Sequence, residues 1–338
     1  MVNIKRKILI VMWYGYSRRA TSLSKELNCE LLLIDSFITK NQKIRKYFLW
    51  IDYSLKTILT FKKLLKIKPD IIISTSPPSF CPIVCYIYCK IFGIKLIVDT
   101  HNSAFLRPWV SVPLYKRVMK NALLVLTHNV ELNNYLARKY YGYNFFVLPD
   151  PLPNFINNKN QTVLGIDKKY FLVILSFSPD EPVELIFRSI MIFLDSIKDS
   201  IFSFYITGNY KKNLAIYNKY KGIPEIKFLG FLDEKNYEQV LVNSYAVISF
   251  STKQMVQQSA VIESLGAAVP VITENSETNR RIFTKGAILT ELVDSKVAEA
   301  FTELIKNYDK LKKEIILQKA EYSLSWKENL NKFLKLLG

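Results

Sequence analysis

The chain has 338 residues, of which 49% are hydrophobic and 22% are charged. Its length is about twice that of an ordinary domain, so two domains are expected, and the composition excludes a wholly disordered chain. The formal net charge is +18. This excess lies mainly in residues 1–150, which carry 23 basic and 8 acidic residues, so the first half is expected to meet an anionic surface or substrate.

Neither of two strongly apolar stretches fits a targeting or membrane-spanning segment. The run 8–13 is too short for a signal peptide, and Arg18 and Arg19 follow it where a small-residue cleavage site would be needed. The stretch 81–94 is shorter than the ~20 apolar residues of a membrane-spanning helix and contains Pro82. The first run therefore predicts a buried strand.

The cysteines lack the spacing of a metal site. Cys81, Cys85 and Cys89 recur every four residues on one face of a predicted helix, without a histidine or a Cys-x-x-Cys pair nearby. Buried, reduced thiols are the preferred interpretation, and no metal ligands are predicted. Reduced thiols also fit a cytoplasmic location, which is therefore expected.

Short β-branched runs alternate with helix-length segments along the whole chain. Continuous apolar runs with this separation are typical of parallel strands covered by helices on both faces. The predicted strands are 7–13, 30–35, 70–75, 95–100, 123–127 and 145–148, then 171–177, 203–207, 226–229, 246–249, 269–273 and 287–289. Helices are predicted over 17–27, 51–65 and most of 311–337, which contains Trp326.

Three prolines within residues 149–153 can continue neither a helix nor a central strand, so a domain junction is predicted there. Two doubly wound α/β domains are the simplest architecture for the whole pattern. In such sheets ligands bind beyond the carboxyl ends of the strands, and two facing sheets would enclose one cleft.

The first predicted strand leads into a turn at Gly15, followed by Arg18 and Arg19. Neither G-x-G-x-x-G nor the phosphate-loop pattern G-x-x-x-x-G-K-[ST] occurs there, which disfavours a nicotinamide dehydrogenase or a P-loop enzyme. A glycine turn before a helix with two arginines can still receive a phosphate. A solvated helix start is an equal alternative.

Both histidines of the chain follow predicted strands. His101 comes just after the fourth strand, beside Asp99 and Asn102, and that position favours a functional role over a structural one. His128 follows the fifth strand, and a structural or supporting role is preferred for it.

Three loops of the second half are expected to converge at the carboxyl ends of their strands. Ser178 lies in the first of these loops and Gly230 in the second. The third loop precedes a predicted helix that starts near Gln258 and Ser259 and carries Glu263. Backbone amides at the helix start can hold phosphate, and the carboxylate can accept hydrogen bonds from sugar hydroxyls. A solvent-facing Glu263 is the alternative.

The segment 260–272, with Glu-Ser-Leu-Gly-Ala-Ala-Val-Pro-Val-Ile, resembles the E-A-x-x-x-G-x-P-V-I signature of family 4-like glycosyltransferases with the GT-B fold. Other pieces agree in order and spacing across essentially the whole chain. They are Lys68-Pro69-Asp70, Val98-Asp99-Thr100-His101-Asn102, the proline junction, Ile206-Thr207-Gly208, Phe228-Leu229-Gly230-Phe231 and Ser325-Trp326.

The resemblance implies roles for particular residues. His101 matches the family histidine near the donor diphosphate and the reacting sugar, and Glu263 matches the distal glutamate of a pair, usually assigned to ribose or nucleotide binding. The sequence departs from the family where Met255 replaces the proximal glutamate and Ala268 the signature glycine. The usual basic pair after the first strand of the second domain is also absent. Candidates for the missing phosphate or sugar contacts are Gln258, Arg280 and Lys285.

The implied protein is a GT-B glycosyltransferase with two Rossmann-like domains. Residues 1–150 would form the acceptor- and membrane-facing domain, 151–322 the nucleotide-sugar domain, and 323–338 a helix that packs back toward the first domain. The donor would be a nucleotide diphosphate sugar, most simply a UDP-sugar, and the acceptor a carbohydrate or a lipid-linked sugar. Neither a permanent cofactor nor a metal is required, and retention of configuration is implied.

Basic and aromatic residues are interleaved between residues 40 and 68, where Asp52 is the only acid. Leu55, Ile58, Leu59, Phe61, Leu64 and Leu65 give a helical apolar face that is predicted to pack on the sheet, leaving the basic residues to contact an anionic leaflet. The basic residues are Lys40, Lys43, Arg45, Lys46, Lys56, Lys62, Lys63, Lys66 and Lys68. Peripheral, salt-sensitive membrane attachment is therefore predicted. An ordinary core-packed helix with a solvated basic face is the alternative.

Three other functions stay open. A non-catalytic GT-B partner subunit would explain the broken glutamate pair, and a sugar-nucleotide epimerase would use the same fold. A nucleic-acid binder is suggested only by the isoelectric point of about 9.5, without a recognised nucleic-acid module, so nucleic acid is not predicted as a partner.

Overall fold

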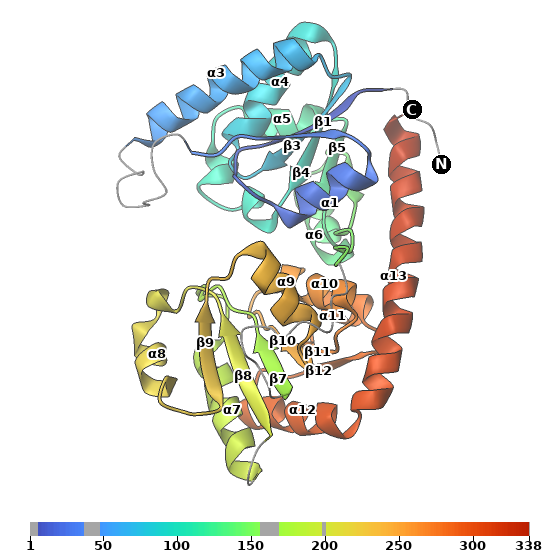
Figure 1. The fold of residues 1–338 in the computed structure, drawn as a ribbon. Coiled ribbons are helices and arrows are strands. Elements are labelled where there is room, and N and C mark those ends of the chain that lie inside the picture. Colours follow the sequence, from blue (N-terminus) through green and yellow to red (C-terminus); the bar gives the residue numbers. More distant parts are fainter. Residues whose placement is uncertain (1–5, 37–47, 156–168, 198–200, 338) are drawn as a thin grey trace. The chain divides into compact units, whose positions relative to one another are not determined.

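The computed structural model describes residues 6–36, 48–155, 169–197 and 201–337, which form two compact units (Figure 1). Unit 1 comprises Met1–Pro151 together with Trp326–Gly338, and unit 2 comprises Leu152–Ser325. The last helix, α13 (Tyr308–Leu337), therefore belongs to unit 2 up to Ser325 and to unit 1 beyond it.

Unit 1 contains a six-stranded parallel sheet in the order β2-β1-β3-β4-β5-β6. Its strands are β1 (Ile8–Met12), β2 (Glu30–Leu33), β3 (Ile71–Ser76), β4 (Lys95–Thr100), β5 (Leu124–Thr127) and β6 (Phe145–Val147). Its other helices are α1 (Arg18–Glu26), α3 (Leu49–Ile67), α4 (Phe80–Phe92), α5 (Tyr115–Asn121) and α6 (Val130–Lys139), with short 3-10 helices η1 (Asn102–Phe105) and η2 (Trp109–Ser111). Right-handed crossovers place α1 on one face and α3, α4 and α5 on the other, where α3 lies beside α4 and α4 beside α5.

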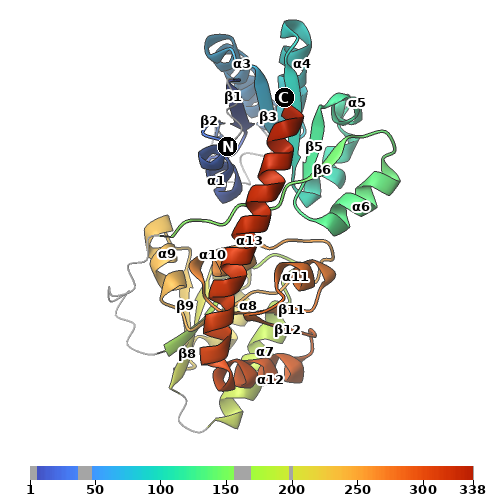
Figure 2. The same cartoon turned by 90° about the vertical axis from the view of Figure 1, so that its right-hand side faces the viewer.

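The end of α13 completes the packing of unit 1 (Figure 2). Phe333 is fully buried and its ring lies 5.9 Å from that of Phe146. Trp326 donates its indole N–H to the carbonyl of Pro149 at 3.0 Å. The carbonyl of Leu337 accepts from Lys95 at 3.3 Å.

Unit 2 repeats this architecture with the sheet order β12-β11-β10-β7-β8-β9, again all parallel. The strands are β7 (Lys169–Val173), β8 (Phe202–Thr207), β9 (Ile226–Gly230), β10 (Ala246–Ile248), β11 (Val271–Glu274) and β12 (Ala287–Thr290). The helices are α7 (Val183–Ser196), α8 (Leu214–Tyr220), α9 (Glu234–Val242), α10 (Ser259–Ala267), α11 (Glu277–Ile282) and α12 (Asp294–Lys306), with η3 (Tyr210–Lys212). One face of the sheet packs around Phe171, whose ring contacts those of Phe193, Phe204 and Phe301.

All twelve predicted strands are confirmed, with shifts at their ends. The largest shift is in the seventh strand, which was expected to reach Phe177 but ends at Val173. Phe177 has φ +56°, a left-handed conformation that cannot continue a strand. The buried position of Cys81, Cys85 and Cys89 on α4 is confirmed as well, and all three thiols are free.

The orientation predicted for α3 is wrong. Its buried positions are Asp52, Lys56, Thr60 and Leu64, whereas most of the apolar positions expected to face the sheet are partly or largely exposed. The polar inner face has a physical cause in Trp13, which is fully buried at the end of β1. The indole N–H of Trp13 donates to Thr60 Oγ1 at 2.9 Å, and its carbonyl accepts from Lys56 Nζ at 3.4 Å.

Lys56 is consequently not part of a basic surface, because its ammonium group also pairs with Asp52 at 3.4 Å. Four further basic residues of the predicted membrane segment lie outside the described residues; they are Lys40, Lys43, Arg45 and Lys46. Nowhere in the described parts of the chain is a helix both long enough and apolar enough to cross a membrane.

Candidate functional site

Five polar side chains gather beyond the carboxyl ends of β4, β5 and β6 in unit 1, and we call them the Arg19 cluster. They are Arg19, Asp99, His101, His128 and Asp150. The guanidinium of Arg19 donates to both oxygens of Asp99 at 2.8–3.2 Å and to Asp150 Oδ1 at 2.5 Å. His128 Nδ1 lies 3.5 Å from the same oxygen of Asp150, and the rings of His128 and His101 meet edge to face with centroids 4.9 Å apart.

Burial and charge fix the protonation of this cluster. Burial alone raises the pKa of Asp99, but the charge and hydrogen bonds of Arg19 outweigh it and lower that pKa to about 2. Burial opposes the charge on Arg19, yet the two carboxylates raise the pKa of its guanidinium above the ordinary value. Burial and the positive charge of Arg19 lower the pKa of His128 to about 3, so this imidazole is neutral at physiological pH. The cluster therefore holds two carboxylates against one guanidinium.

His101 is the member of the cluster that can reach a ligand. It is half-buried, it follows β4 directly, and its backbone N–H donates to the carbonyl of Ser76 at 2.8 Å. Its ring packs against the ring of His128. Residues further along the segment that starts at His101 line an open depression of about 760 Å³. They are Arg107, Pro108, Ser111, Val112 and Pro113.

The turn after β1 differs from expectation in one respect. Arg19 was expected to suit a phosphate, but it is buried and bound to two carboxylates, so it is an organiser of the cluster and not an anion ligand. Gly15 lies in the exposed turn, where a Cβ would approach the Asp35 carboxylate to 2.6 Å. The amide of Ala20 at the start of α1 is already capped by the Ser17 hydroxyl.

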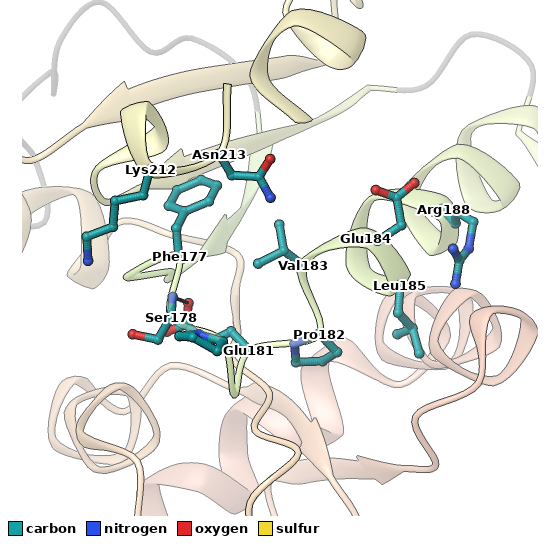
Figure 3. Close-up of a pocket in the computed structure, with 11 residues that line it drawn as sticks. Phe177, Ser178, Glu181, Pro182, Val183, Glu184, Leu185, Arg188, Lys212 and Asn213 are labelled. Atoms are coloured by element: carbon teal, nitrogen blue, oxygen red, sulfur yellow. Dashed lines mark hydrogen bonds between the residues drawn. The ribbon is translucent and has the colours of Figure 1, made fainter. Parts of the chain in front are cut away.

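In unit 2, Ser178 lies in the loop between β7 and α7 (Figure 3). The carboxylate of Glu181 binds the backbone amide groups of this loop. It accepts hydrogen bonds from the amides of Ser176 and Ser178 at 3.0–3.1 Å. The Ser178 hydroxyl pairs with that of Ser176 at 2.6 Å. An anion that used these amides would have to displace Glu181.

A depression of about 490 Å³ adjoins this loop. Figure 3 shows Lys212 on one side of it and Glu184 and Arg188, both from α7, on the other. Arg188 is bound to Asp294 at 2.6 Å. Two basic side chains are held against the loop itself. Lys212 donates to the carbonyl of Ser176 at 2.8 Å, and Lys253 pairs with Asp180 at 3.2 Å.

The side chain of Gln258 is engaged within the protein. Its amide N–H donates to Glu274 at 2.9 Å, and its oxygen accepts from Ser249 at 2.6 Å. Glu274 is buried at the end of β11 and also accepts from the amide of Ser251 and the side chain of Asn279. Burial raises the pKa of Glu274, although these hydrogen bonds oppose the shift. This network fixes the loop that leads into α10.

Glu263 lies on α10 and is only 8% exposed, which excludes the solvent-facing alternative. The hydroxyl of Tyr237, from α9, donates to its carboxylate. Gln258 is the N-cap residue of α10 but makes no capping hydrogen bond with its side chain, and Ser259 is exposed at the first position. The helix thus places amides and a carboxylate one turn apart.

The remaining predicted residues lie at different edges of the sheet. Gly230 ends β9 at the carboxyl edge with φ +73°, and its carbonyl accepts from Gly208. Arg280 reaches back from α11 to the side chain of Asn275, just after β11, at 2.8 Å. Lys285 precedes β12, which puts it at the amino edge, where it pairs with Glu321 at 2.6 Å. Lys285 is therefore not carried into the proposed donor site.

Sequence reasoning missed Asp150, Tyr237, Glu181 and Glu274 as members of these networks. The burial of Arg19 was predictable from the sequence, because Arg19 lies on the same face of α1 as the apolar residues Ala20 and Leu23. Among the described residues, no group of three or more His, Cys, Asp or Glu side chains could hold a metal ion.

No protein-family profile and no curated protein matches the sequence. Solved structures do match its fold. Anabaena Alr3699/HepE in complex with UDP-glucose is 14% identical, has a TM-score of 0.65, and the match covers 98% of this chain and 99% of that one. Sucrose-phosphate synthase from Thermosynechococcus elongatus is 10% identical, with a TM-score of 0.70 and 98% coverage of both chains. A UDP-GlcNAc 2-epimerase from Methanocaldococcus jannaschii is 16% identical, with a TM-score of 0.56 and coverage of 88% and 92%.

At these identities the likeness establishes the fold. The two six-stranded parallel sheets with their surrounding helices are those of the HepE and sucrose-phosphate synthase structures. The chain has the two-domain Rossmann-like α/β architecture of the GT-B class.

Proposed function

We propose that the protein is a glycosyltransferase that moves a sugar from a nucleotide diphosphate sugar, most simply a UDP-sugar, to a carbohydrate acceptor. The observation that carries the proposal is the start of α10, where an N-terminus without a side-chain cap lies one turn before the buried carboxylate of Glu263. Helix amides suit a diphosphate, and a carboxylate suits the hydroxyls of a ribose. The fold supports it, since HepE of the same architecture was crystallised with UDP-glucose.

The phosphate contacts would come from groups that the family pattern does not supply. Beside the α10 amides and Ser259, the basic candidates at the carboxyl edge include Lys212, Lys253 and Arg280. Gln258 would act indirectly, because its side chain holds Glu274 and thereby the loop before α10. Ser178 and Gly230 would shape the edge around the donor.

His101 is the proposed catalytic residue in unit 1. Its half-buried imidazole can donate a hydrogen bond to a charged oxygen of the donor or the reacting sugar, while His128 and the rest of the Arg19 cluster hold the ring. The reaction needs mainly positioning and stabilisation of the leaving diphosphate. Transfer of a hexose with retention of configuration is the form that we propose.

The acceptor would bind unit 1, and the depression lined by Arg107 and Ser111 is the candidate place. We propose a carbohydrate or lipid-linked sugar used in cell-surface polysaccharide or glycoconjugate synthesis. The protein would then work in the cytoplasm, attached peripherally to the inner face of the membrane.

Two alternatives have specific support. The epimerase structure has the same architecture, and an epimerase would convert its nucleotide sugar without any acceptor. A non-catalytic partner subunit would be consistent with Met255 at the proximal glutamate position and with Glu181 on the loop amides.

The test is a screen of UDP-sugars with the purified chain, with and without free and lipid-linked acceptors. Nucleotide release that requires an acceptor, together with a sugar–acceptor product, is the expected result. Conversion of the donor sugar without an acceptor would identify an epimerase instead. Absence of both nucleotide binding and turnover would contradict the enzyme assignment.

A further inference from the structure

We propose that unit 1 attaches to an anionic membrane by inserting an apolar surface formed by α3 and α4, which we call the α3–α4 face. It consists of Trp50, Leu55, Ile58 and Leu65 on α3 and of Phe80, Ile87, Ile91 and Phe92 on α4. The inference rests on the membrane location in the proposed function and deepens it by naming the surface. It also changes the mode of attachment, because the sequence alone predicted contact by basic residues with the apolar face turned inward.

The amphipathic pattern of α3 is inverted relative to that of an ordinary surface helix. At about 100° per residue, Ile58 and Leu65 lie on the opposite side of the helix from Lys56 and Thr60. Lys56 and Thr60 are fully buried, whereas Ile58 is 66% exposed and Trp50 is 70% exposed. The polar inner face is used by the indole and carbonyl of Trp13, so the apolar outer face is not needed for packing within unit 1.

α4 continues this surface. Ile91 is 62% exposed, and Phe80 and Ile87 lie on the same side of the helix as Ile91. Phe92 is 48% exposed at the end of the helix, where its ring contacts that of Tyr88. The two helices lie side by side (Figure 1) and aromatic contacts close the seam between them. The rings of Tyr53 and Phe80 are 4.9 Å apart, and Phe61 contacts Tyr88 at 5.5 Å. The exposed apolar side chains thus lie on two helices that are packed against each other, and such a concentration is unusual for a free surface.

The charge around this face favours an anionic membrane over a second copy of the chain as its binding partner. Both helices carry exposed lysines, of which Lys62, Lys66 and Lys90 lie beside the apolar side chains, and residues 49–68 and 80–92 contain no exposed acid, since Asp52 is buried. A second copy of the chain docked face to face would bring lysines against lysines. An anionic leaflet satisfies both properties, because its headgroups attract the lysines and its acyl boundary accepts tryptophan, phenylalanine and isoleucine side chains.

Neither helix is long and apolar enough to cross a bilayer. The face would therefore lie in the plane of the leaflet, with its apolar side chains at the boundary between headgroups and acyl chains.

The experiment is co-sedimentation of the full chain with vesicles of phosphatidylglycerol mixed with phosphatidylcholine, and of phosphatidylcholine alone, at low and high salt. The apolar variant carries Ile58→Gln and Ile91→Gln, and the charge variant carries Lys62→Gln, Lys66→Gln and Lys90→Gln. The matched control carries Ile192→Gln and Leu214→Gln, which are 44% and 54% exposed in unit 2. All of these positions are exposed, so folding is expected to be preserved.

We expect the wild type to prefer the anionic vesicles and to retain part of its binding at high salt. Since burial of each isoleucine side chain is worth roughly a tenfold change in partitioning or more, the apolar variant should bind at least tenfold more weakly. The control should bind as the wild type does. The charge variant should lose the preference for anionic lipid. Tryptophan emission should shift to the blue on binding, and Trp50→Phe should remove most of that shift.

Binding of the apolar variant at the wild-type level, or an equal loss in the control, would overturn the inference and leave peripheral attachment standing. Wild-type chain that sediments with no vesicle at low salt would overturn both the inference and the membrane location. Sugar transfer to a soluble acceptor does not depend on vesicle binding. Loss of that transfer would therefore signal a failure of the transferase proposal, and loss of vesicle binding alone would not. Self-association that the apolar variant abolishes would assign the face to a second copy and overturn the membrane inference.

Discussion

His128 should make unit 1 sensitive to mild acid. Its side chain is buried in the Arg19 cluster, where burial and the charge of Arg19 lower the pKa of the imidazole from 6.5 to about 3. The unfolded chain binds a proton at His128 below its ordinary pKa, and the folded chain does not. A depressed folded pKa therefore contributes stability at neutral pH that is lost as the pH falls from about 6.5 toward 3.

The size of the effect follows from this difference. Between pH 7 and pH 5, the free energy of unfolding of unit 1 should fall by about 2 kcal/mol through His128 alone. With an ordinary denaturant dependence, this is a shift of roughly 1 M in the urea midpoint. Asp99, with a pKa of about 2, adds to the loss only below about pH 4, because its stabilisation is present above its unfolded pKa. His128→Gln removes the titrating group and should flatten the profile over the same interval.

The chain offers a direct readout. Its four tryptophans, Trp13, Trp50, Trp109 and Trp326, all belong to unit 1, so tryptophan fluorescence during urea unfolding follows that unit. We expect the wild type and the control His101→Gln to lose stability from pH 7 to pH 5, and His128→Gln to lose much less. Parallel profiles for the wild type and His128→Gln would refute the assignment of a neutral, buried imidazole.

Three further predictions concern the candidate site and the scaffold. A hydrogen bond from His101 to charged oxygen is worth ~1.5–3 kcal/mol, so His101→Ala should lower turnover by roughly 10- to 150-fold with an unchanged melting temperature, and near-normal kinetics would remove His101 from the site. Glu263→Gln should raise the dissociation constant for UDP by roughly tenfold or more in calorimetry, while an unchanged constant would leave Glu263 as a structural partner of Tyr237. Gly208→Ala should lower the melting temperature more than Gly230→Ala, although both glycines have positive φ. The new Cβ would lie 1.8 Å from the Leu175 carbonyl oxygen at position 208, but 3.5 Å from the Tyr210 ring at position 230. Equal losses in the two variants would contradict this close approach at Gly208.

The strands were predictable because their signal is local. Ile71–Ser76 starts with three isoleucines after Asp70 and ends before two prolines, and a parallel sheet buries all six of its residues. The orientation of α3 was not predictable from its own pattern. It depends on the polar groups of Trp13, which lies far away in the sequence, and on an apolar face that stays exposed.

The site was predictable only as a set of strand ends. Sequence reasoning placed His101 and Glu263 correctly at a strand end and on a helix, because position after a strand is readable along the chain. It did not reveal that Glu181 occupies the loop amides or that Gln258 is bound to Glu274, since these partners are fixed by side-chain packing. The role of Arg19 changed for the same reason, because Asp150 comes from the opposite end of the unit's sequence.

The discontinuity of unit 1 has a consequence for biosynthesis. Unit 2 is one uninterrupted segment, whereas unit 1 is completed only by Trp326–Gly338, where Trp326, Leu330, Phe333 and Leu337 are all buried. On the ribosome, domains generally fold as their residues emerge. Unit 2 can therefore finish folding first, although its sequence starts after that of unit 1. Until Phe333 is available, the apolar surface of unit 1 around Phe146 stays uncovered. The emergence of residues 326–337 then becomes the event that closes the core of unit 1.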